Sequence, residues 1–572
     1  MTVYSDRFWK KSWDEGLEDL DPSEWKSIGS LPQAFKKSFD NFPNKVALSY
    51  YGVEITFKDI DLYSNQFANM LIEKGLDKGD VVALNLPNIP EYVIGLVGSL
   101  KAGCIVSGVS TLLSEVQIQY KLSDIAEAGK KVSLFTLDTL CYKKFRRIAS
   151  TLPQLKLVIT CNLGDFLPKF KKSLGKLSKR IPKGMKGYLR DKEVINFHRE
   201  ILIKYPTTPV NVEVNGEDLA FIKYTGGTTA LPKGAMLTHS NSVSNLLIVK
   251  KWFGWKQGEG ISCSAFPFFH IAGIFFCESC LFNAQTQILI PKPQDINYIS
   301  KMLEKYKPNL IVNVPSIYQL LLKNERFKKI DFSNLEYCIS SAAPFPSESK
   351  KQLVAIIGEG KLIEAYGMTE TSPIITLNPA KGKKKLDSIG LPIMNTELTI
   401  MDPEIETIVQ LGEPGEIWVR GPQVMQGYYN KPQETKIVLN EDGFLRTGDI
   451  AVMDEEGYLK IVGRRKDMII VSGFKVFSKK VEDTIYRHPA IENLAIIGIP
   501  NPERPGSELV KAFIKLDSDY EFNGSENDLK KEIIRFTKAR SSPYEVPKII
   551  EFVDNLPLTS EGFVDKKALR NL

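Results

Sequence analysis

The segment Tyr224–Gly234, which reads YTGGTTALPKG, decides the fold class expected for this 572-residue chain. It contains three glycines, three threonines and a lysine, and it follows the apolar run Leu219–Ile222, which is typical of a buried strand. Glycines let a backbone approach an anion closely, threonine hydroxyls donate hydrogen bonds or reach a metal ion, and lysine adds positive charge. The segment therefore predicts a phosphate-binding loop rather than an ordinary glycine-rich surface turn. It is not a Walker loop, because Lys233 is followed by glycine instead of serine or threonine.

The chain around this loop alternates between the patterns of strands and helices. Val81–Leu84 reads as a buried strand, and Tyr92–Lys101, which follows a proline, reads as a helix. Leu310–Val312 and Tyr337–Ile339 read as further buried strands. This alternation predicts an α/β fold with largely parallel sheets, in which ligands bind at the carboxyl ends of the strands.

Length and composition limit the class of protein. A chain of 572 residues exceeds one ordinary hydrophobic core, and its 43% hydrophobic and 25% charged residues are typical of a globular protein with two or more domains. We expect neither a secretory signal nor a membrane span, because no apolar stretch is long enough. Seven cysteines without dense spacing favour a reducing, cytoplasmic location. Cys277 and Cys280 form a lone C-x-x-C pair, which we interpret as buried thiols rather than a zinc or redox site.

A basic stretch at residues 166–190 is the most uneven feature of the charge distribution. From Lys169 to Lys192 there are ten Lys or Arg residues and one acid, in a chain whose net charge is only +7. Four apolar residues of this stretch share one face of a helix: Phe166, Phe170, Leu174 and Leu177. Two interpretations remain open, an interfacial helix that faces anionic lipid headgroups and a solvated surface helix that packs on the sheet. Nucleic acid is not an expected partner, because no base-reading module accompanies the charge.

Four blocks of sequence carry a resemblance to a known family. The Tyr224–Gly234 loop, with Ala230 where a glycine is usual, resembles the phosphate loop of the adenylate-forming superfamily of acyl-CoA synthetases, luciferases and peptide-synthetase adenylation domains. The other blocks follow in the family's order: Tyr366–Glu370, Thr447–Asp449 and Gly463–Asp467. Within the family, the chain resembles a long-chain fatty acid–CoA ligase. The resemblance implies a large nucleotide- and acyl-binding domain at residues 1–465, with mixed and parallel sheets, and a small mobile α+β domain at residues 466–572.

The activity that the resemblance implies has two steps. A carboxylate attacks the α-phosphate of ATP to give an acyl-adenylate and pyrophosphate, and the thiol of coenzyme A then displaces AMP. We therefore expect an ATP-dependent acyl-CoA ligase for a fatty or other apolar carboxylic acid, which uses ATP, Mg²⁺ and coenzyme A. The sequence determines neither the acyl chain length nor the oligomeric state.

The resemblance also implies roles for individual residues. Tyr366 stacks on adenine, the Thr369 hydroxyl donates to the α-phosphate, and Glu370 holds Mg²⁺, a hard cation that prefers oxygen ligands. Asp449 accepts hydrogen bonds from both ribose hydroxyls, because a carboxylate offers two acceptor oxygens. Taken alone, each block also matches an ordinary turn, in which Asp449 would cap its own backbone. The implied catalytic residues are Lys233, Thr369, Glu370 and Lys466, and the implied metal ligands are Thr225 and Glu370. The implied contacts to nucleotide, acyl group or coenzyme A are Thr225, Gly226, Gly227, Thr228, Thr229, His270, Ser341, Ala342, Tyr366, Gly367, Asp449, Arg464 and Gly473.

Several implied contacts lie in distinctive local contexts. The small residues Ser341 and Ala342 follow a predicted strand and would let a flat ring lie against the backbone. His270 lies in an aromatic run, where a histidine is commonly a satisfied core residue but where the family lines its acyl pocket. Lys466 stands at the family's hinge, and Gly473 in the loop used for the thioester step. The other three histidines have no such context, and we expect them to be structural.

The C-terminal block departs from the family's pattern. The family has a lysine straight after a glycine in this block, whereas here Phe563 follows Gly562. An ammonium group about 4 Å from an anion contributes about 4 kcal/mol at an effective dielectric of about 20, so its loss slows the first step by roughly a thousandfold. Three hypotheses stay open. The chain is a working ligase in which another residue, such as Lys566 or Lys567, replaces the lysine; it is weak in adenylation but forms the thioester from a supplied acyl-adenylate; or it is a degenerate member that only binds nucleotide or acyl-adenylate.

Overall fold

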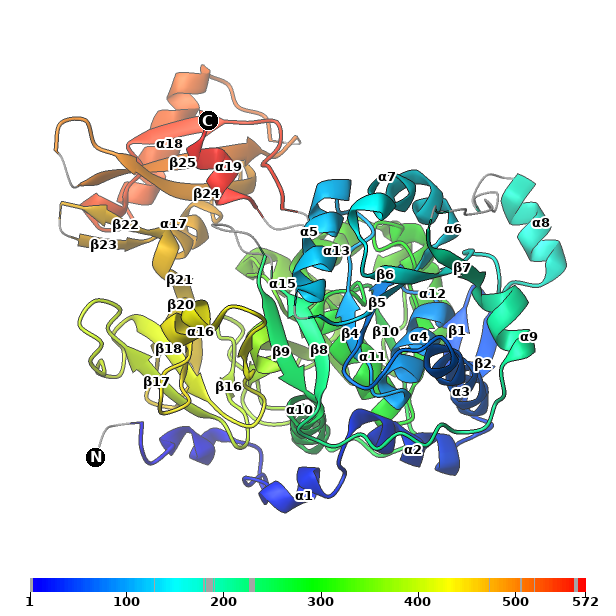
Figure 1. Cartoon of the computed structure of the whole chain (residues 1–572). Helices are drawn as coiled ribbons and strands as arrows, with labels where there is room; N and C mark the ends of the chain where they lie inside the picture. The colour runs from blue at the N-terminus through cyan, green and yellow to red at the C-terminus, as the bar shows by residue number, and fades with distance from the viewer. Residues whose placement is uncertain are drawn as a thin grey trace.

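The computed structural model of the chain (Figure 1) describes residues 4–127, 129–177, 181, 189, 191–225, 232–472, 474–504, 507–518, 520–559 and 564–572. The described residues form two large sheets, a smaller sheet beside them, and two small sheets near the C-terminus. Strands and helices alternate along the chain, and the large sheets contain both parallel and antiparallel pairs. The predicted α/β class with mixed sheets is therefore confirmed. All seven cysteines are buried and free.

Sheet A carries the glycine-rich loop. Its strands lie in the order β19 (Gly427–Tyr428), β9 (Gly234–Thr238), β8 (Leu219–Tyr224), β4 (Ile105–Gly108), β3 (Val81–Asn85), β5 (Val132–Leu137), β6 (Leu155–Cys161) and β7 (Glu193–Asn196). The strands from β8 to β7 are parallel, whereas β9 pairs antiparallel with β8 and places Gly234 opposite Tyr224. The predicted phosphate loop is thus the connection between β8 and β9.

Sheet B carries the other predicted ligand segments. Its strands lie in the order β16 (Leu391–Pro392), β15 (Ile374–Leu377), β14 (Leu362–Gly367), β13 (Tyr337–Ser340), β12 (Leu310–Asn313), β10 (Ile261–Ser264), β11 (Thr286–Leu289), β1 (Val46–Tyr50) and β2 (Val53–Thr56). The predicted strands at 310–312 and 337–339 are β12 and β13, and each extends one residue further. Because β13 and β14 are parallel neighbours, the segments that follow them leave the same edge of the sheet.

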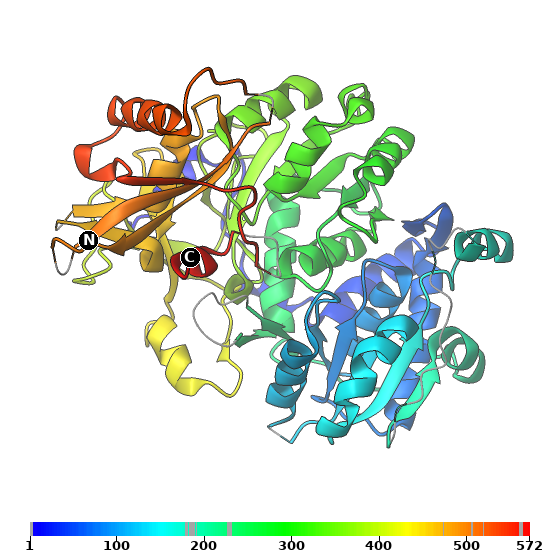
Figure 2. The same cartoon turned by 90° about the horizontal axis from the view of Figure 1, so that it is seen from above.

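Helices that are buried on most sides separate sheet A from sheet B (Figure 2). They are α4 (Pro90–Lys101), α10 (His239–Phe253) and α11 (Ile271–Phe282), and such an all-round apolar surface is typical of an interior helix. The helix predicted to start at Tyr92 begins at Pro90, because proline fits the first helical turn. In α4, a Cβ at Gly98 would lie 2.8 Å from the Ser64 carbonyl oxygen of α3 (Phe57–Glu73). Glycine at this position therefore lets α3 and α4 approach closely.

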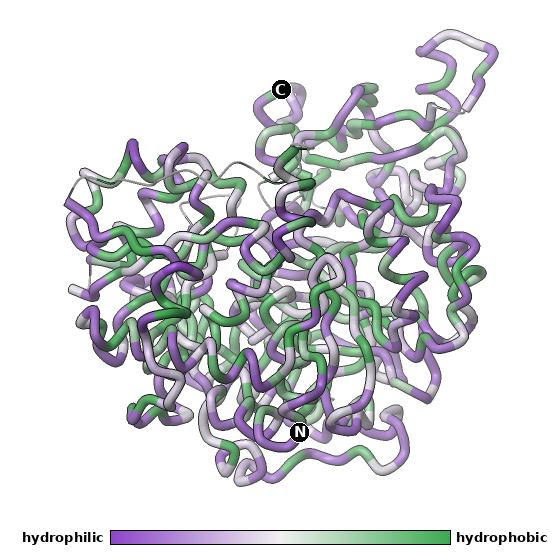
Figure 3. Tube along the Cα trace, turned by 90° about the vertical axis from the view of Figure 1, so that its right-hand side faces the viewer, coloured by the Kyte–Doolittle hydropathy of each residue, from purple (hydrophilic) through white to green (hydrophobic). Residues whose placement is uncertain are grey.

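Further helices cover the outer faces of the two sheets. The outer face of sheet A packs against α5 (Glu115–Ala126), the short helix η2 (Cys141–Phe145) and α7 (Arg146–Ile148), whereas Leu140 of α6 (Asp138–Leu140) packs on the main core. The outer face of sheet B packs against α12 (Ile296–Tyr306), α13 (Pro315–Leu322), α14 (Glu325–Lys328) and α15 (Ser347–Ile357). The remaining helices of the large part are α1 (Pro22–Lys26), α2 (Leu31–Asn41), α8 (Lys169–Leu177), α9 (Leu202–Lys204) and α16 (Pro432–Val438). Hydrophobic segments accordingly gather inside the body and hydrophilic segments along its outline (Figure 3).

Sheet C and the C-terminal part complete the described chain. Sheet C is antiparallel, in the order β17 (Glu397–Met401), β18 (Gly415–Arg420), β20 (Leu445–Met453) and β21 (Leu459–Arg464). The C-terminal part contains β22 (Met468–Val471), β23 (Phe474–Phe477), α17 (Ser478–Ile485), β24 (Ile491–Pro500), β25 (Glu508–Leu516), α18 (Glu526–Lys538), β26 (Ile549–Phe552) and α19 (Lys566–Arg570). It buries its own hydrophobic clusters between residues 469 and 569. This separate core supports a division near residues 465 and 466, whose boundary stays a prediction.

The basic stretch forms α8, which projects from the edge of the molecule in Figure 1. The helix begins at Lys169 rather than at Phe166, because the residue before Pro168 is disfavoured in a helical conformation. Phe166 lies outside the helix and packs against Tyr63. The other three apolar residues are exposed by 78% at Phe170, 55% at Leu174 and 82% at Leu177, so this face is not packed on a sheet. Among the described residues, every helix is too short or too polar to span a bilayer.

His239 couples the first residue of α10 to α2. Its ring is buried, and its Nδ1 accepts a hydrogen bond of 3.2 Å from the Leu31 backbone N–H at the start of α2. Burial lowers the pKa of His239 to about 3, from an ordinary value of 6.5. Between these two values the unfolded chain binds a proton at this residue that the folded chain does not bind. The folded state therefore loses stability as the pH falls from about 6.5 towards 3.

We expect the free energy of unfolding to fall by about 2 kcal/mol between pH 7 and pH 5 through His239 alone. In His239→Gln, which keeps an acceptor for the Leu31 amide, this part of the pH dependence should be absent. Urea unfolding of both proteins at the two pH values, followed by tryptophan fluorescence, measures the difference. The same loss in wild type and variant would contradict the assignment.

Candidate active site

The β8–β9 connection begins and ends with described contacts. The Thr225 backbone N–H donates a hydrogen bond of 2.9 Å to the Lys233 carbonyl oxygen, which closes the base of the loop. The Lys233 Nζ forms an ion pair with Glu434 of α16 and lies 5.1 Å from the centre of the Tyr428 ring. The predicted contacts Gly226, Gly227, Thr228 and Thr229 lie outside the described residues. The structure thus describes the loop's base and its lysine.

The Tyr366–Glu370 block bends sharply at the end of β14. A Cβ at Gly367 would lie 1.8 Å from the Pro373 carbonyl oxygen, so only glycine fits this position. Thr369 and Glu370 then form the 3₁₀ turn η5 (Thr369–Thr371). Gly367, which is predicted to contact the nucleotide, is therefore required by the backbone conformation itself.

Glu370 is a buried carboxylate with a neutral partner. It is 6% exposed, and its Oε1 accepts a hydrogen bond of 2.7 Å from the Tyr428 hydroxyl. Burial raises the pKa of Glu370, because desolvation disfavours its charged form. A divalent cation would reverse this effect, and a buried oxygen ligand without a lysine or arginine hydrogen-bonded to it suits Mg²⁺. The donor chemistry at Glu370 therefore fits the implied metal.

Asp449 connects β20 to two neighbouring strands. The Tyr366 hydroxyl, at the end of β14, donates a hydrogen bond of 2.7 Å to Oδ2 of Asp449. Arg464 lies opposite Asp449 on β21, and its Nε is 3.0 Å from Oδ1. Asp449 is the first cause of the raised pKa of Arg464. Three residues that the sequence analysis linked to the nucleotide are thus in direct contact.

Glu416 on β18 supports this network, and the sequence analysis did not identify it. It is 2% exposed, and its Oε1 accepts a hydrogen bond of 2.9 Å from the Gly448 backbone N–H. Its other carboxylate oxygen lies 3.3 Å from Arg465. No local pattern marks Glu416, because its partners lie 32 and 49 residues further along the chain.

Ser341 and Ala342 leave β13 beside the end of β14. Ala342 has a backbone φ of 68°, in the left-handed region that residues other than glycine rarely adopt. The Ser341 N–H donates to the Asn313 carbonyl oxygen over 3.4 Å. Strain of this kind is common where a backbone is shaped around a ligand. The placement agrees with the predicted role beside a flat ring, which stays a prediction.

His270 caps the N-terminus of α11. Its Nδ1 accepts a hydrogen bond of 3.3 Å from the Ala272 N–H, and its ring lies nearly parallel to that of Phe266. Burial, together with the nearby Lys223, lowers the pKa of His270 to about 4. The ring is therefore neutral near pH 7. His270 therefore has a hydrogen-bond partner within the protein and also lines a pocket.

One pocket brings the histidine and the threonine of the prediction together. It lies between sheet A and the start of α11. Its lining residues are Gly108, Ser110, Leu113, Lys121, Lys223, Tyr224, Phe269, His270, Ile271 and Thr369. Lys223 was not predicted as a site residue, although a lysine directly after the apolar run of β8 was a visible signal. Burial lowers the pKa of Lys223 to about 7 and raises the pKa of Glu278 on α11 to about 8.

The structure describes only some of the residues that are predicted to act from the C-terminal part of the chain. Lys466 lies in the short turn η6 (Arg465–Asp467), and burial lowers its pKa. Gly473 and Phe563 lie outside the described residues. Lys566 forms an ion pair of 2.7 Å with Glu482, so it is held on α17 in this arrangement.

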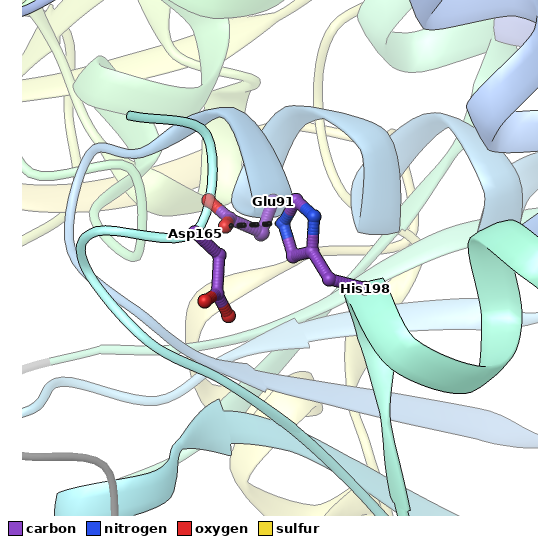
Figure 4. A group of neighbouring side chains, drawn as sticks. All are labelled: Glu91, Asp165 and His198. Atoms are coloured by element: carbon purple, nitrogen blue, oxygen red, sulfur yellow. Dashed lines mark hydrogen bonds and ion pairs between the residues drawn. The ribbon is translucent and has the colours of Figure 1, made fainter. Parts of the chain in front are cut away.

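His198, expected to be structural, belongs to a second polar cluster (Figure 4). Its Nε2 lies 3.0 Å from Oε1 of the buried Glu91 on α4, and Asp165 is close to both. Burial raises the pKa of Glu91. Asp165 forms an ion pair of 2.6 Å with Lys172 of α8 and accepts from the Asn162 N–H. Each side chain thus has a partner in the chain, and the cluster holds the base of α8 against α4.

Two family models match the chain. The model described as AMP-binding enzyme matches residues 35–429, and the model described as AMP-binding enzyme C-terminal domain matches residues 480–562. Curated relatives extend over nearly the whole chain. A long-chain-fatty-acid–CoA ligase of Bacillus subtilis (strain 168) is 36% identical over 549 residues, which cover 94% of each protein. One of Escherichia coli O157:H7 is 34% identical over 563 residues, which cover 97% of this chain and 96% of the relative.

Solved structures share the fold. ATP-bound MatB from Rhodopseudomonas palustris matches with a TM-score of 0.81 at 26% identity, over 95% of this chain and 98% of that one. The anthranilate CoA ligase AuaEII in complex with anthranoyl-AMP matches with a TM-score of 0.83 at 24% identity, over 96% of this chain and 98% of that one, which shows the fold alone. From its family models and its curated relatives, the chain belongs to the AMP-binding enzyme family.

Proposed function

We propose that this protein is an ATP-dependent long-chain fatty acid–CoA ligase, which converts its acid to an acyl-adenylate and then to the coenzyme A thioester. The observation that carries the proposal is the meeting of Thr369 and His270 in one pocket at the base of the β8–β9 loop. Relatives at 34–36% identity carry the name of this activity. The relatives give no support to a degenerate, nucleotide-binding member over a working ligase.

The nucleotide is proposed to lie along the edge where β13 and β14 end, beside Asp449 of β20. Tyr366 would stack on adenine beside Ser341 and Ala342, and Asp449 would exchange its internal hydrogen bonds for the ribose hydroxyls. Arg464 is already positioned on Asp449 and would keep that carboxylate in place. These residues bind and orient the nucleotide without entering the chemistry.

The phosphates are proposed to lie between the β8–β9 loop and η5. Lys233 would leave Glu434 for a phosphate oxygen, and the Thr369 hydroxyl would donate to the α-phosphate. Glu370 and Thr225 would hold Mg²⁺, which supplies charge neutralisation between phosphate oxygens when bound. The acid would enter past His270, whose neutral ring adds no further charge to the pocket.

The second step is proposed to use the C-terminal part. We divide the chain into residues 1–465 and 466–572, with Lys466 at the hinge and Gly473 in the loop that approaches the thioester site. The ion pair of Arg570 with Asp467, at 2.8 Å, ties the chain's last helix to this hinge. A rearrangement at Lys466 would therefore carry the whole C-terminal core with it.

A lipid surface is the proposed site of contact for α8. Phe170, Leu174 and Leu177 form an exposed apolar face, and Lys169 and Lys171 beside them are exposed. Large apolar side chains are stabilised by leaving water, and lysines near a membrane are attracted to anionic headgroups. The anchored base of α8 at Asp165 and Lys172 holds this face away from the body. We propose that α8 binds anionic membranes peripherally, where long-chain acids partition.

The acid specificity tests the proposed function. With ATP, Mg²⁺ and coenzyme A, a ladder of acids from acetate to palmitate should give pyrophosphate and acyl-CoA, with kcat/KM rising roughly fourfold per methylene until the pocket is filled. The rise follows from burying about 0.8 kcal/mol per methylene. A peak at short acids would contradict the long-chain assignment. If the protein forms thioester from supplied acyl-adenylate but releases no pyrophosphate in response to acid, it catalyses only the second step.

Asp449→Asn tests the nucleotide site. It keeps the size of the side chain but loses the charge, so we expect AMP and ATP to bind roughly 10- to 100-fold more weakly. Isothermal titration measures both affinities. Asp454→Asn, at a half-buried acid just after the same strand, is the matched control and should bind as the wild type does. Unchanged affinity in Asp449→Asn would remove Asp449 from the proposed site.

Vesicle binding tests α8. The full chain should bind vesicles that contain anionic lipid more tightly than neutral vesicles, and the binding should weaken at high salt. Replacing Phe170, Leu174 and Leu177 together by serine should reduce this binding at least tenfold in a flotation assay. Serine at the equally exposed Ile405 and Ile437 provides the control. Equal binding by the α8 variant and the wild type would show that this face does not contact lipid.

A further inference from the structure

Strand β8 carries a buried lysine whose amine lies 5.4 Å from the centre of the Phe221 ring but has no hydrogen-bond partner among the described residues. Lys223 is 2% exposed, and its Nζ makes no hydrogen bond within the described part of the chain. A buried polar group left without an acceptor costs about 1–3 kcal/mol, and more when it is charged. Lys223 also lines the pocket that contains His270 and Thr369. A buried amine at a pocket wall, without a hydrogen-bond acceptor among the described residues, indicates a ligand that supplies the acceptor.

Gly108, the last residue of β4, fixes where the Lys223 amine lies. A Cβ at Gly108 would be 3.1 Å from Nζ of Lys223 and 2.8 Å from Cα of Phe269. Gly108 and Phe269 both line the pocket. The amine therefore lies at the pocket wall, beside the segment that leads into His270, and glycine at this position leaves room for it.

An internal ion pair with Glu278 is the simplest structural alternative. Glu278 on α11 is 2% exposed and close enough to Lys223 for each to influence the other. A pair retained for stability would satisfy both groups, because a buried ion pair is tolerated only with good geometry. Yet Nζ of Lys223 and Oε1 of Glu278 both lack a hydrogen-bond partner among the described residues. Glu278 thus does not fill the position that Lys223 leaves open.

The lining of the pocket indicates the chemistry of the missing partner. Lys121, Ser110 and Thr369 are charged or polar, whereas Leu113, Phe269 and Ile271 are apolar. An anionic head attached to an apolar chain matches both sets of residues. Building on the ligase function above, we propose that Lys223 binds the carboxylate of the incoming acid and holds it beside Thr369.

The role of this contact follows from the charges in the first step. A carboxylate oxygen forms a bond to the α-phosphorus, the bond from that phosphorus to the bridging oxygen of the β-phosphate breaks, and pyrophosphate leaves with the electron pair. No proton is transferred, because the acid enters as its carboxylate. Two anions must approach each other, and Lys223 neutralises one of them. In the acyl-adenylate this oxygen no longer carries the carboxylate charge, so the second step does not depend on Lys223.

The assignment also accounts for the departure at residue 563. The resemblance leads to a lysine at this position, but Phe563 is neutral and cannot bridge two anions. Lys223 brings a cation to the acid from a strand of sheet A instead. The adenylation step then needs the cation on β8 and does not need one in the C-terminal block.

Lys223→Met separates the two half-reactions. It keeps the length of the side chain and removes the charge, so kcat/KM for the acid in pyrophosphate release should fall roughly 10- to 150-fold. Acyl-CoA formation from supplied acyl-adenylate and coenzyme A should stay within about threefold of the wild type, as should the affinity for ATP. Adding Phe563→Lys to Lys223→Met should restore part of the lost pyrophosphate release.

Glu278→Gln is the matched control, since it changes the other unpaired group of the same neighbourhood. Glu278→Gln should retain acid-dependent pyrophosphate release. If Lys223 and Glu278 were only a structural pair, both variants would lose thermal stability, and the rates of both half-reactions would fall equally. Lys223→Gln provides a second test if the methionine variant folds poorly. Full pyrophosphate release in either Lys223 variant, or equal loss in both half-reactions, would overturn the assignment. A wild type that is inactive in both assays would overturn the ligase function itself.

Discussion

The Asp449 carboxylate is the interaction on which the arrangement of the candidate site depends. It is 7% exposed on β20, accepts a hydrogen bond from Tyr366 at the end of β14, and pairs with Arg464 at the end of β21. A carboxylate this deep in the protein is tolerated only when hydrogen bonds and an opposite charge surround it. The edge of sheet B, the strands of sheet C and the segment that enters the C-terminal part are therefore held at one point. A group that binds Asp449 acts on all three.

Tyr428 provides a corresponding link at the phosphate side. Its hydroxyl holds Glu370, and the Lys233 ammonium lies over its ring. β19, which contains Tyr428, is the edge strand of sheet A next to β9. The lysine of the loop and the carboxylate of η5 are therefore positioned by one aromatic side chain from a third segment. On the proposed function, a rigid support of this kind would keep the two charged groups apart until a phosphate and a cation bind between them.

Much of the fold was predictable from the sequence, because its strands are continuous apolar runs between turn residues. Val81–Leu84 became β3 with only one additional residue, since a strand covered on both faces must be apolar throughout. The start of α8 was predicted wrongly at Phe166, because a regular spacing of apolar residues continued past Pro168 while the proline set the real boundary. Local periodicity therefore defines the interior of an element better than its ends.

The site was predictable only where its residues are adjacent in sequence. Thr369 and Glu370 belong to one block, but the Tyr428 hydroxyl that holds Glu370 lies 58 residues away. The Tyr366–Asp449 contact spans 83 residues, and only the resemblance brought the two together in advance. Contacts of this length follow from how the sheets pack, which no local pattern contains. Lys223 is different, since its own position in an apolar run marks it, and only the pocket shows why that lysine is there.

The location of Lys223 on β8 has a consequence for how the two halves of the chain divide the reaction. A cation carried by a loop of a mobile domain must be ordered each time the domain closes, and the entropy of that ordering opposes the first step. A cation on a strand between β4 and β9 is fixed before any ligand arrives. The protein without its ligand bears this cost instead, as a buried amine without a hydrogen-bond acceptor in the described part of the chain. On this arrangement the large domain holds the positive charge for adenylation by itself. The C-terminal part, with its own core and an ion pair at its hinge, is left to enclose the site and to serve the thioester step.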